Sequence, residues 1–190
     1  MNNYQIVINR INELLDSDKE VIIVAIDGKC GSGKSTLASY LSDYYDCNVF
    51  HLDDFFLQLH QRVNQRLLEI GGNVDYERFN EEVLNKLINH QDVLYQPFNC
   101  TKMHIETGSL IKFKRLNIIE GSYCNNPHFN DPYDLKIFKD IDDIQQIENI
   151  KKRNPDKLEQ FINTWIPKEN KYFNYYHIKD NCLVIPYQQD

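Results

Sequence analysis

The segment at positions 28–35, GKCGSGKS, constrains the fold of this chain more than any other stretch. It holds three of the chain's seven glycines and directly follows the longest apolar run, VIIVAI at 21–26. Downstream, Leu37, Leu41 and Tyr44 recur at helical spacing. A buried strand, a glycine-rich turn and an amphipathic helix in this order predict a parallel strand that leads, through a tight loop, into a helix N-terminus.

This segment matches the pattern G-x-x-x-x-G-K-[ST] in full. Glycines let the backbone turn its N–H groups toward phosphate oxygens, and the helix that follows points its positive dipole end at the same anion. Lys34 is expected to neutralise the β- and γ-phosphates, and the Ser35 hydroxyl to ligate magnesium. ATP and Mg²⁺ are therefore the expected cofactors. The residues predicted to bind the nucleotide are Gly28, Cys30, Gly31, Ser32, Gly33, Lys34, Ser35 and Thr36. A glycine-rich turn that matches by chance is the alternative, but the strand and helix that the motif requires are both expected here.

Along the rest of the chain, apolar strand patterns alternate with amphipathic helices. Strands are predicted within 47–54, 115–121, 133–141 and 181–186, and helices within 4–15 and 76–90. A charged helical stretch within 142–176 is predicted to break near Asn154-Pro155 and again at Pro167. We expect one α/β domain over 1–190, a parallel β-sheet flanked by helices, with a loop or mobile flap at about 58–73.

Composition excludes several classes of protein. The net charge of −7 argues against a nucleic-acid partner, because duplex binders usually carry a basic face. The longest apolar run is too short to span a bilayer, and no secretory signal pattern begins the sequence, so we expect no membrane partner and a cytoplasmic location. The five cysteines show no C-x-x-C spacing and are expected to be free thiols.

Carboxylates end two of the predicted strands. Asp53 and Asp54 close FHLDDFF, and Glu120 closes LNIIEG. Because parallel strands end at the same edge of an open sheet, these side chains should face the glycine-rich loop. One of the two aspartates could accept the proton of an attacking hydroxyl, and Glu120 could hold magnesium. Spacing alone does not separate Asp53 from Asp54. No guanine-reading N-K-x-D motif is present, which favours a small-molecule kinase over a GTPase switch.

Together these elements resemble the uridine kinase-like branch of the P-loop kinases, which also includes phosphoribulokinase and bacterial pantothenate kinase. The resemblance covers nearly the whole chain, through VIIVAIDGKCGSGKSTLA, NVFHLDDFF, GGNVDYERF, YQPFNC, NIIEGSY and KRNPDKLEQFINTWIPKENKYF. It implies a P-loop NTPase fold with a helical lid at about 145–160. It also implies that Asp53 is the catalytic base and that Glu120 lies near magnesium.

The same resemblance assigns roles on the acceptor side. Asp75 in NVDY corresponds to a residue that binds ribose hydroxyls, and Phe98 in QPFNC falls near a tyrosine that lies beneath the base. His104 is only a loose counterpart of the family's next histidine. In the lid, IQQIENIKKRN has lost most of the family's arginines, and Arg153 alone aligns with one of them. Arg153 is expected to stabilise charge on the transferring phosphate.

The resemblance leaves three functions open. The first is transfer of the γ-phosphate of ATP to a hydroxyl of a nucleoside, uridine- or cytidine-like. The second has another acceptor, pantothenate, nicotinamide riboside or a sugar phosphate, for which Arg62 and Arg66 in the flap could supply cations. The third is a nucleotide-binding regulator with little turnover. A homo-oligomer is possible, as in related kinases. Trp165 with Phe161 is interpreted as core or lid packing rather than as a platform for a base.

Overall fold

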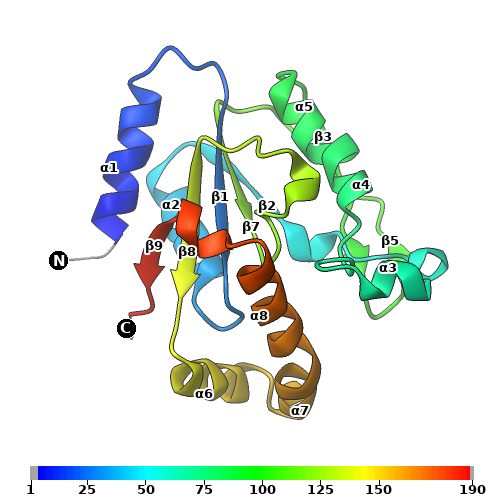
Figure 1. The fold of residues 1–190 in the computed structure, drawn as a ribbon. Helices are drawn as coiled ribbons and strands as arrows, with labels where there is room; N and C mark the ends of the chain where they lie inside the picture. Colours follow the sequence, from blue (N-terminus) through cyan, green and yellow to red (C-terminus); the bar gives the residue numbers. More distant parts are fainter. Residues whose placement is uncertain (1–3, 189–190) are drawn as a thin grey trace.

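The computed structural model describes residues 4–188 of the chain. At its centre lies a five-stranded sheet in which every pairing is parallel (Figure 1). In spatial order the strands are β2 (Cys47–His51), β7 (Leu116–Glu120), β1 (Ile22–Gly28), β8 (Leu135–Asp140) and β9 (Leu183–Pro186). The predicted parallel sheet is therefore confirmed, with β1 at its centre.

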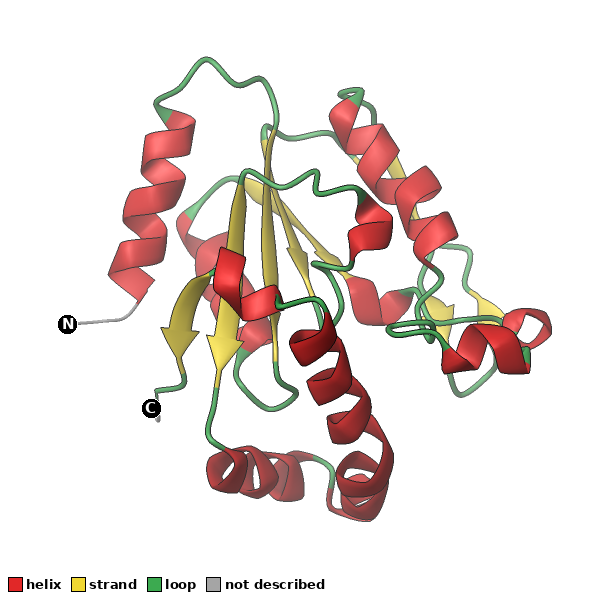
Figure 2. Ribbon diagram, in the orientation of Figure 1, coloured by secondary structure: helices red, strands yellow, loops and turns green. Residues whose placement is uncertain are grey.

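Helices cover both faces of the sheet (Figure 2). On one face α1 (Tyr4–Leu15) and α2 (Lys34–Tyr44) bury Val7, Ile11, Leu37 and Leu41 against the strands. The other face is covered by one continuous helical run and by α8 (Ile166–Tyr175). That run consists of α4 (Tyr76–Phe79), the π-turn η3 (Asn80–Leu84) and α5 (Asn85–Ile88). All seven residues of β1 are buried, because the strand is covered on both faces.

The segment after β8 forms a helical arm at the foot of Figure 1, where the resemblance predicts a lid. It consists of α6 (Asp143–Arg153), η5 (Pro155–Lys157), α7 (Leu158–Gln160), the π-turn η6 (Phe161–Trp165) and α8. The predicted break at Asn154 is confirmed, since α6 ends there. The predicted break at Pro167 is wrong. Pro167 lies in the first turn of α8, where the preceding π-turn and the helix start tolerate a residue without an N–H.

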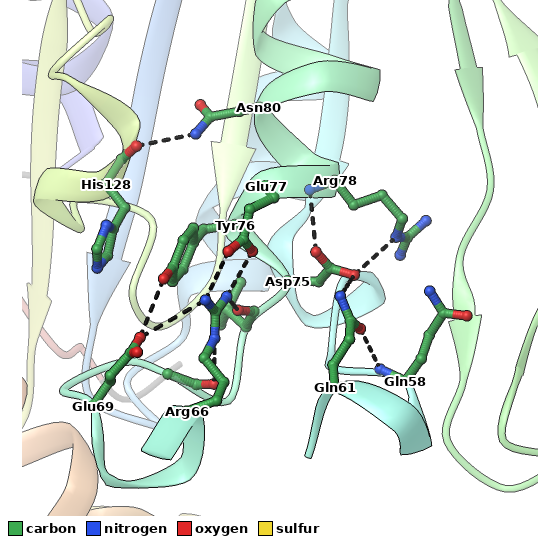
Figure 3. Close-up of polar contacts among 12 residues, drawn as sticks. Gln58, Gln61, Arg66, Glu69, Asp75, Tyr76, Glu77, Arg78, Asn80 and His128 are labelled. Carbon is green, nitrogen blue, oxygen red and sulfur yellow. Dashed lines mark hydrogen bonds and ion pairs between the residues drawn. The ribbon is translucent and has the colours of Figure 1, made fainter. Parts of the chain in front are cut away.

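The predicted flap, residues 58–73, is more regular than its sequence suggests. It contains η2 (Leu59–Gln61) and α3 (Asn64–Leu68). Arg66 holds it in place, because its guanidinium donates to the carbonyl oxygens of Gly72 and Val74 and forms a two-pronged ion pair with Glu77, both N···O distances being 2.7 Å (Figure 3). Polar contacts thus tie the flap both to itself and to the residues that follow it, Val74 and Glu77.

Short elements complete the described chain. They are η1 (Leu52–Asp54), η4 (Pro127–Phe129), η7 (Ile178–Asn181), the pair β3 (Val93–Tyr95) and β6 (Ser109–Ile111), and the pair β4 (Phe98–Asn99) and β5 (His104–Ile105). All five cysteines are free. Among the described residues no helix is both long and apolar enough to cross a membrane.

Candidate active site

The glycine-rich loop joins β1 to α2 at the carboxyl end of the sheet. Gly28, Gly31 and Gly33 have φ values of 137°, 77° and 85°, which only glycine adopts without strain. A Cβ on Gly28 would lie 2.1 Å from the carbonyl oxygen of Lys139, so this position also needs the close approach that glycine permits. Gly33 is the N-cap of α2 and supplies no side-chain cap. The first amides of α2 are therefore available to an anion.

Lys34 folds back over this loop. Its Nζ donates to the carbonyl oxygens of Gly28 (2.8 Å) and Lys29 (3.1 Å) and to Ser122 Oγ (3.2 Å). Burial alone would lower the pKa of Lys34, but the carboxylates of Glu169, Asp53, Glu120 and Asp27 outweigh it and raise that pKa. A lysine held charged beside loop amides is suited to bind phosphate.

A cavity of about 380 Å³ opens beside the loop, and we call it the main cavity. It brings together five of the residues predicted to act in catalysis or metal binding: Lys34, Ser35, Asp53, Glu120 and Arg153. Cys30, Gly31, Gly33 and Thr36 line it as well. A larger groove of about 900 Å³ runs beside the ends of β8 and β9, but it includes none of those five residues. The main cavity is therefore the candidate active site.

Ser35 and Glu120 meet at one side of the main cavity. Ser35 Oγ lies 3.2 Å from Glu120 Oε1, and His51 Nδ1 lies 2.6 Å from that same oxygen. Burial would raise the pKa of Glu120, but the His51 contact and the charge of Lys34 outweigh it and lower that pKa. The group thus offers a hydroxyl and an ionised carboxylate, the hard oxygen donors that Mg²⁺ prefers when phosphates and waters supply its other ligands. The residues present fit the predicted magnesium site.

Asp53 and Asp54 have different surroundings, although they are neighbours in η1. Asp54 accepts a 2.6 Å hydrogen bond from the Tyr95 hydroxyl and does not line the main cavity. Asp53 faces that cavity and accepts no hydrogen bond from any residue in the range 4–188. Asp53 is exposed to the cavity, yet the protein near it desolvates the carboxylate and raises its pKa to about 6, with Lys34 opposing this rise and Glu120 adding to it. Asp53 is thus the aspartate placed to accept a proton.

The segment predicted to form a lid brings two cations to the main cavity. Arg153 ends α6, and its Nε donates to Asn154 Oδ1 at 2.9 Å. Lys157 in η5 lines the same cavity and escaped the sequence analysis. Trp165 and Phe161, whose ring centroids lie 4.4 Å apart, also line it, together with Phe56. The interpretation of Trp165 as core or lid packing is therefore incomplete, because its side chain also lines the main cavity.

Of the three residues predicted to contact the acceptor, Asp53 lines the main cavity, whereas Asp75 and Phe98 lie outside its lining. Asp75 is buried at the start of α4, where it accepts hydrogen bonds from the Arg78 amide (3.1 Å) and from Gln61 Nε2 (2.8 Å) (Figure 3). Phe98 is buried in β4. Asn73 and Cys100, from neighbouring segments, line this cavity instead. Acceptor roles for Asp75 and Phe98 would require these segments to move, and they stay predictions.

Sequence reasoning missed Glu169, which reaches the loop from α8. Its Oε2 accepts a 2.9 Å hydrogen bond from the Cys30 amide, and its Oε1 accepts one of 2.5 Å from Ser122 Oγ. A carboxylate of the chain itself thus occupies part of the anion-binding loop. No local pattern marks Glu169, because the contact joins residues 139 positions apart.

Asp27 anchors the loop from below. This fully buried carboxylate accepts hydrogen bonds from the amides of Gly28, Tyr123 and Asn125 and from the Tyr172 hydroxyl (2.8 Å). Burial raises the pKa of Asp27 to about 6, while the hydrogen bonds, including that from Tyr172, favour the ionised form and lower it. The Tyr172 contact therefore stabilises the fold above about pH 6 and is weakened as the pH falls through that value.

Tyr172→Phe tests this anchor. We expect the free energy of unfolding to fall by roughly 1.5–3 kcal/mol at pH 7.5, the value of a hydrogen bond to a charged group, and by less at pH 5. Urea denaturation at both pH values measures the loss. Tyr133→Phe is the matched control, because the Tyr133 hydroxyl donates to the neutral carbonyl of Cys124 and its loss should not depend on pH. An equal loss at both pH values for Tyr172→Phe would contradict the role given to Asp27.

Comparisons with known proteins agree with this architecture. A family model of shikimate kinase matches residues 30–96, less than half of the chain. No curated protein matches.

The fold is similar to that of a possible uridine kinase from Bacillus stearothermophilus, with TM-score 0.70, 18% identity, and 96% of this chain and 97% of the other covered. A candidate fructose transport system kinase from Silicibacter sp. TM1040 gives a TM-score of 0.65 and 20% identity, with 99% of this chain and 100% of the other covered. For YFH7, a P-loop kinase candidate from Saccharomyces cerevisiae, the TM-score is 0.58 and the identity 14%, with the whole of both chains covered. The chain therefore has the P-loop NTPase fold, in the form found in P-loop kinases.

Proposed function

We propose that this P-loop protein is an ATP- and Mg²⁺-dependent kinase that transfers the γ-phosphate to a hydroxyl of a nucleoside, uridine- or cytidine-like. One observation carries the proposal. The loop lysine, the Ser35–Glu120 pair and an aspartate without a hydrogen-bond partner in the described chain surround a single cavity. Phosphoryl transfer needs positioning and charge stabilisation more than covalent chemistry, and these groups supply both.

Each residue has a definite task in this mechanism. Lys34 and the loop amides bind the β- and γ-phosphates, and Ser35 with Glu120 would hold the magnesium ion. That ion neutralises charge on the phosphates when it is bound. Asp53 accepts the proton of the acceptor hydroxyl as its oxygen approaches the γ-phosphorus. Arg153 and Lys157 stabilise the charge on the transferring group from the lid side.

The lining of the acceptor side supports a planar acceptor. Phe56, Phe161 and Trp165 offer ring faces and edges, and Asn73 offers both a donor and an acceptor of hydrogen bonds. A phosphorylated acceptor has less support, because the cations of the flap are occupied. Arg66 is bound to Glu77 and to backbone carbonyls, and Arg62 Nε donates to the Leu57 carbonyl. Nicotinamide riboside and pantothenate stay alternatives to a pyrimidine nucleoside.

Two observations favour a second candidate, a nucleotide-binding regulator with little turnover. Glu169 occupies part of the loop, and the lid lacks the arginines of the resembled family. Both features lower the expected rate without preventing nucleotide binding.

Release of ADP across a panel of acceptors tests the proposal. We expect ATP consumption that depends on uridine or cytidine, with little stimulation by sugar phosphates. Phosphorus NMR of the product identifies the new phosphate ester. Binding of ATP in calorimetry with no acceptor-dependent ADP would reject the kinase and leave the regulator. Nicotinamide riboside and pantothenate in the same panel identify the alternative acceptors.

A further inference from the structure

Lys139 of β8 is a buried cation that the mechanism above does not use. Its side chain is 1% exposed. Its Nζ donates to the carbonyl oxygen of Pro186 at 3.2 Å and lies 5.3 Å from the centre of the Tyr4 ring. Among residues 4–188 it has no carboxylate partner, so two of its three N–H donors have no hydrogen-bond acceptor there. Burial lowers the pKa of Lys139. Such a cation is costly to keep unless a ligand satisfies it.

Lys139 lies beside the N-terminus of α2. A Cβ built on Gly33 would be 4.0 Å from Lys139 Cε and 3.9 Å from Thr36 Oγ1. Lys139 therefore adds positive charge where the dipole of α2 is already positive. An anion placed between Lys139 and the first turn of α2 would reverse this repulsion, because both would then attract it.

A second cavity, the outer cavity, of about 200 Å³, adjoins the main cavity at this point. Gly31, Gly33, Thr36 and Arg153 line both cavities, whereas Lys139 and Tyr187 line only the outer one. Asp53 and Glu120 line only the main cavity. A nucleotide whose terminal phosphate faces Asp53 must therefore extend its nucleoside along the loop into the outer cavity. The phosphate nearest the nucleoside then lies where the two cavities meet.

We propose that Lys139 binds the α-phosphate of the nucleotide from the outer side of the loop. The inference rests on the proposed function, since it takes ATP as the ligand. Lys34 and Lys139 then hold opposite ends of the phosphate chain, one from each cavity. A phosphate oxygen suits Lys139 better than a neutral base nitrogen does, because a hydrogen bond between opposite charges is the stronger one.

Lys139→Met tests this assignment, because methionine is unbranched and apolar and fits the buried stem of lysine. The matched control is Lys136→Met on the same strand, where Lys136 pairs with Asp131 at the surface. Dissociation constants for ATP, inorganic pyrophosphate and adenosine are measured by calorimetry, and thermal unfolding verifies that each variant is folded. We expect Lys139→Met to weaken ATP binding about tenfold, the value of a hydrogen bond to a charged group, and to change pyrophosphate binding less than about twofold. Lys139→Arg should restore most of the affinity for ATP.

The two diastereomers of adenosine 5′-O-(1-thiotriphosphate) probe the α-phosphate directly. The native protein should prefer one of them, since sulfur replaces a different oxygen in each, and Lys139→Met should lose this preference. Unchanged ATP binding, or a preference kept in the variant, overturns the inference. If the affinities for ATP and pyrophosphate fall equally, Lys139 supports the whole loop. If the affinities for ATP and adenosine fall equally, Lys139 contacts the nucleoside. Either result also overturns the inference. If the native protein binds no ATP, the proposed function fails with it, whereas native binding without an effect of the variant overturns only the role of Lys139.

Discussion

Asp53→Asn is expected to lower kcat by about 10³-fold while the protein stays folded and binds ATP as before. The asparagine has nearly the shape of the aspartate but cannot accept the proton of the acceptor hydroxyl. Asp53 makes no hydrogen bond within residues 4–188, so its replacement breaks no described hydrogen bond and removes only one of several carboxylates near Lys34. The loss should therefore appear in kcat, measured by ADP release with saturating acceptor, and little in thermal stability.

Asp54→Asn is the matched control for this variant. Asp54 accepts the Tyr95 hydroxyl, so we expect a modest loss of stability and a kcat within about tenfold of the native value. The native kcat/KM should rise with pH through about 6, because Asp53 must lose its proton to act as a base and protein surroundings raise its pKa to that value. If Asp54→Asn abolishes turnover while Asp53→Asn keeps it, the two roles are exchanged and the proposed mechanism is wrong.

Lys34→Met is expected to weaken ATP binding by at least about 10²-fold. The variant removes the charge that would face the β- and γ-phosphates, and it also leaves the carboxylates of Glu169, Asp53 and Glu120 without their shared cation. ATP then meets a loop whose net charge has become more negative. Calorimetric titration with ATP in the presence of Mg²⁺ measures the effect.

Lys29→Met controls for the loss of a lysine from the same loop. Lys29 Nζ contacts the carbonyl oxygen of Ile141 and the carboxylate of Asp143, both at 2.9 Å, and it does not line the main cavity. Its removal should change the affinity for ATP only a few-fold. Equal losses in the two variants would show that the loop responds to total charge and that Lys34 has no special position.

The sheet and the loop were predictable because their signals are local. A fully apolar strand, a run of glycines and an amphipathic helix lie next to one another in the chain, and strand ends place Asp53 and Glu120 at one edge. The parallel order follows from the alternation of strands and helices. The helix break predicted at Pro167 is wrong, because a π-turn just before this residue lets the helix continue.

The parts of the site that escaped prediction depend on contacts between distant segments. Glu169, His51 and Lys139 received no role from the sequence, and only the fold brings each to the loop or to Glu120. The reverse holds for the residues predicted to bind the acceptor, because a local motif is present but the fold gives its side chain other partners. Asp75 lies in a segment that resembles a ribose-binding motif, yet its carboxylate is engaged by Gln61 and the Arg78 amide.

The carboxylate that α8 places on the Cys30 amide makes nucleotide uptake an exchange of anions. The free protein already holds one negative group against this loop, so an incoming phosphate meets a partly satisfied receptor and must take the place of an existing bond. Any measured affinity is then a difference between two competing ligands, one of them part of the polypeptide. In this protein, whose net charge is −7, the Glu169 carboxylate also keeps the Cys30 N–H hydrogen-bonded after one nucleotide leaves and before the next one binds.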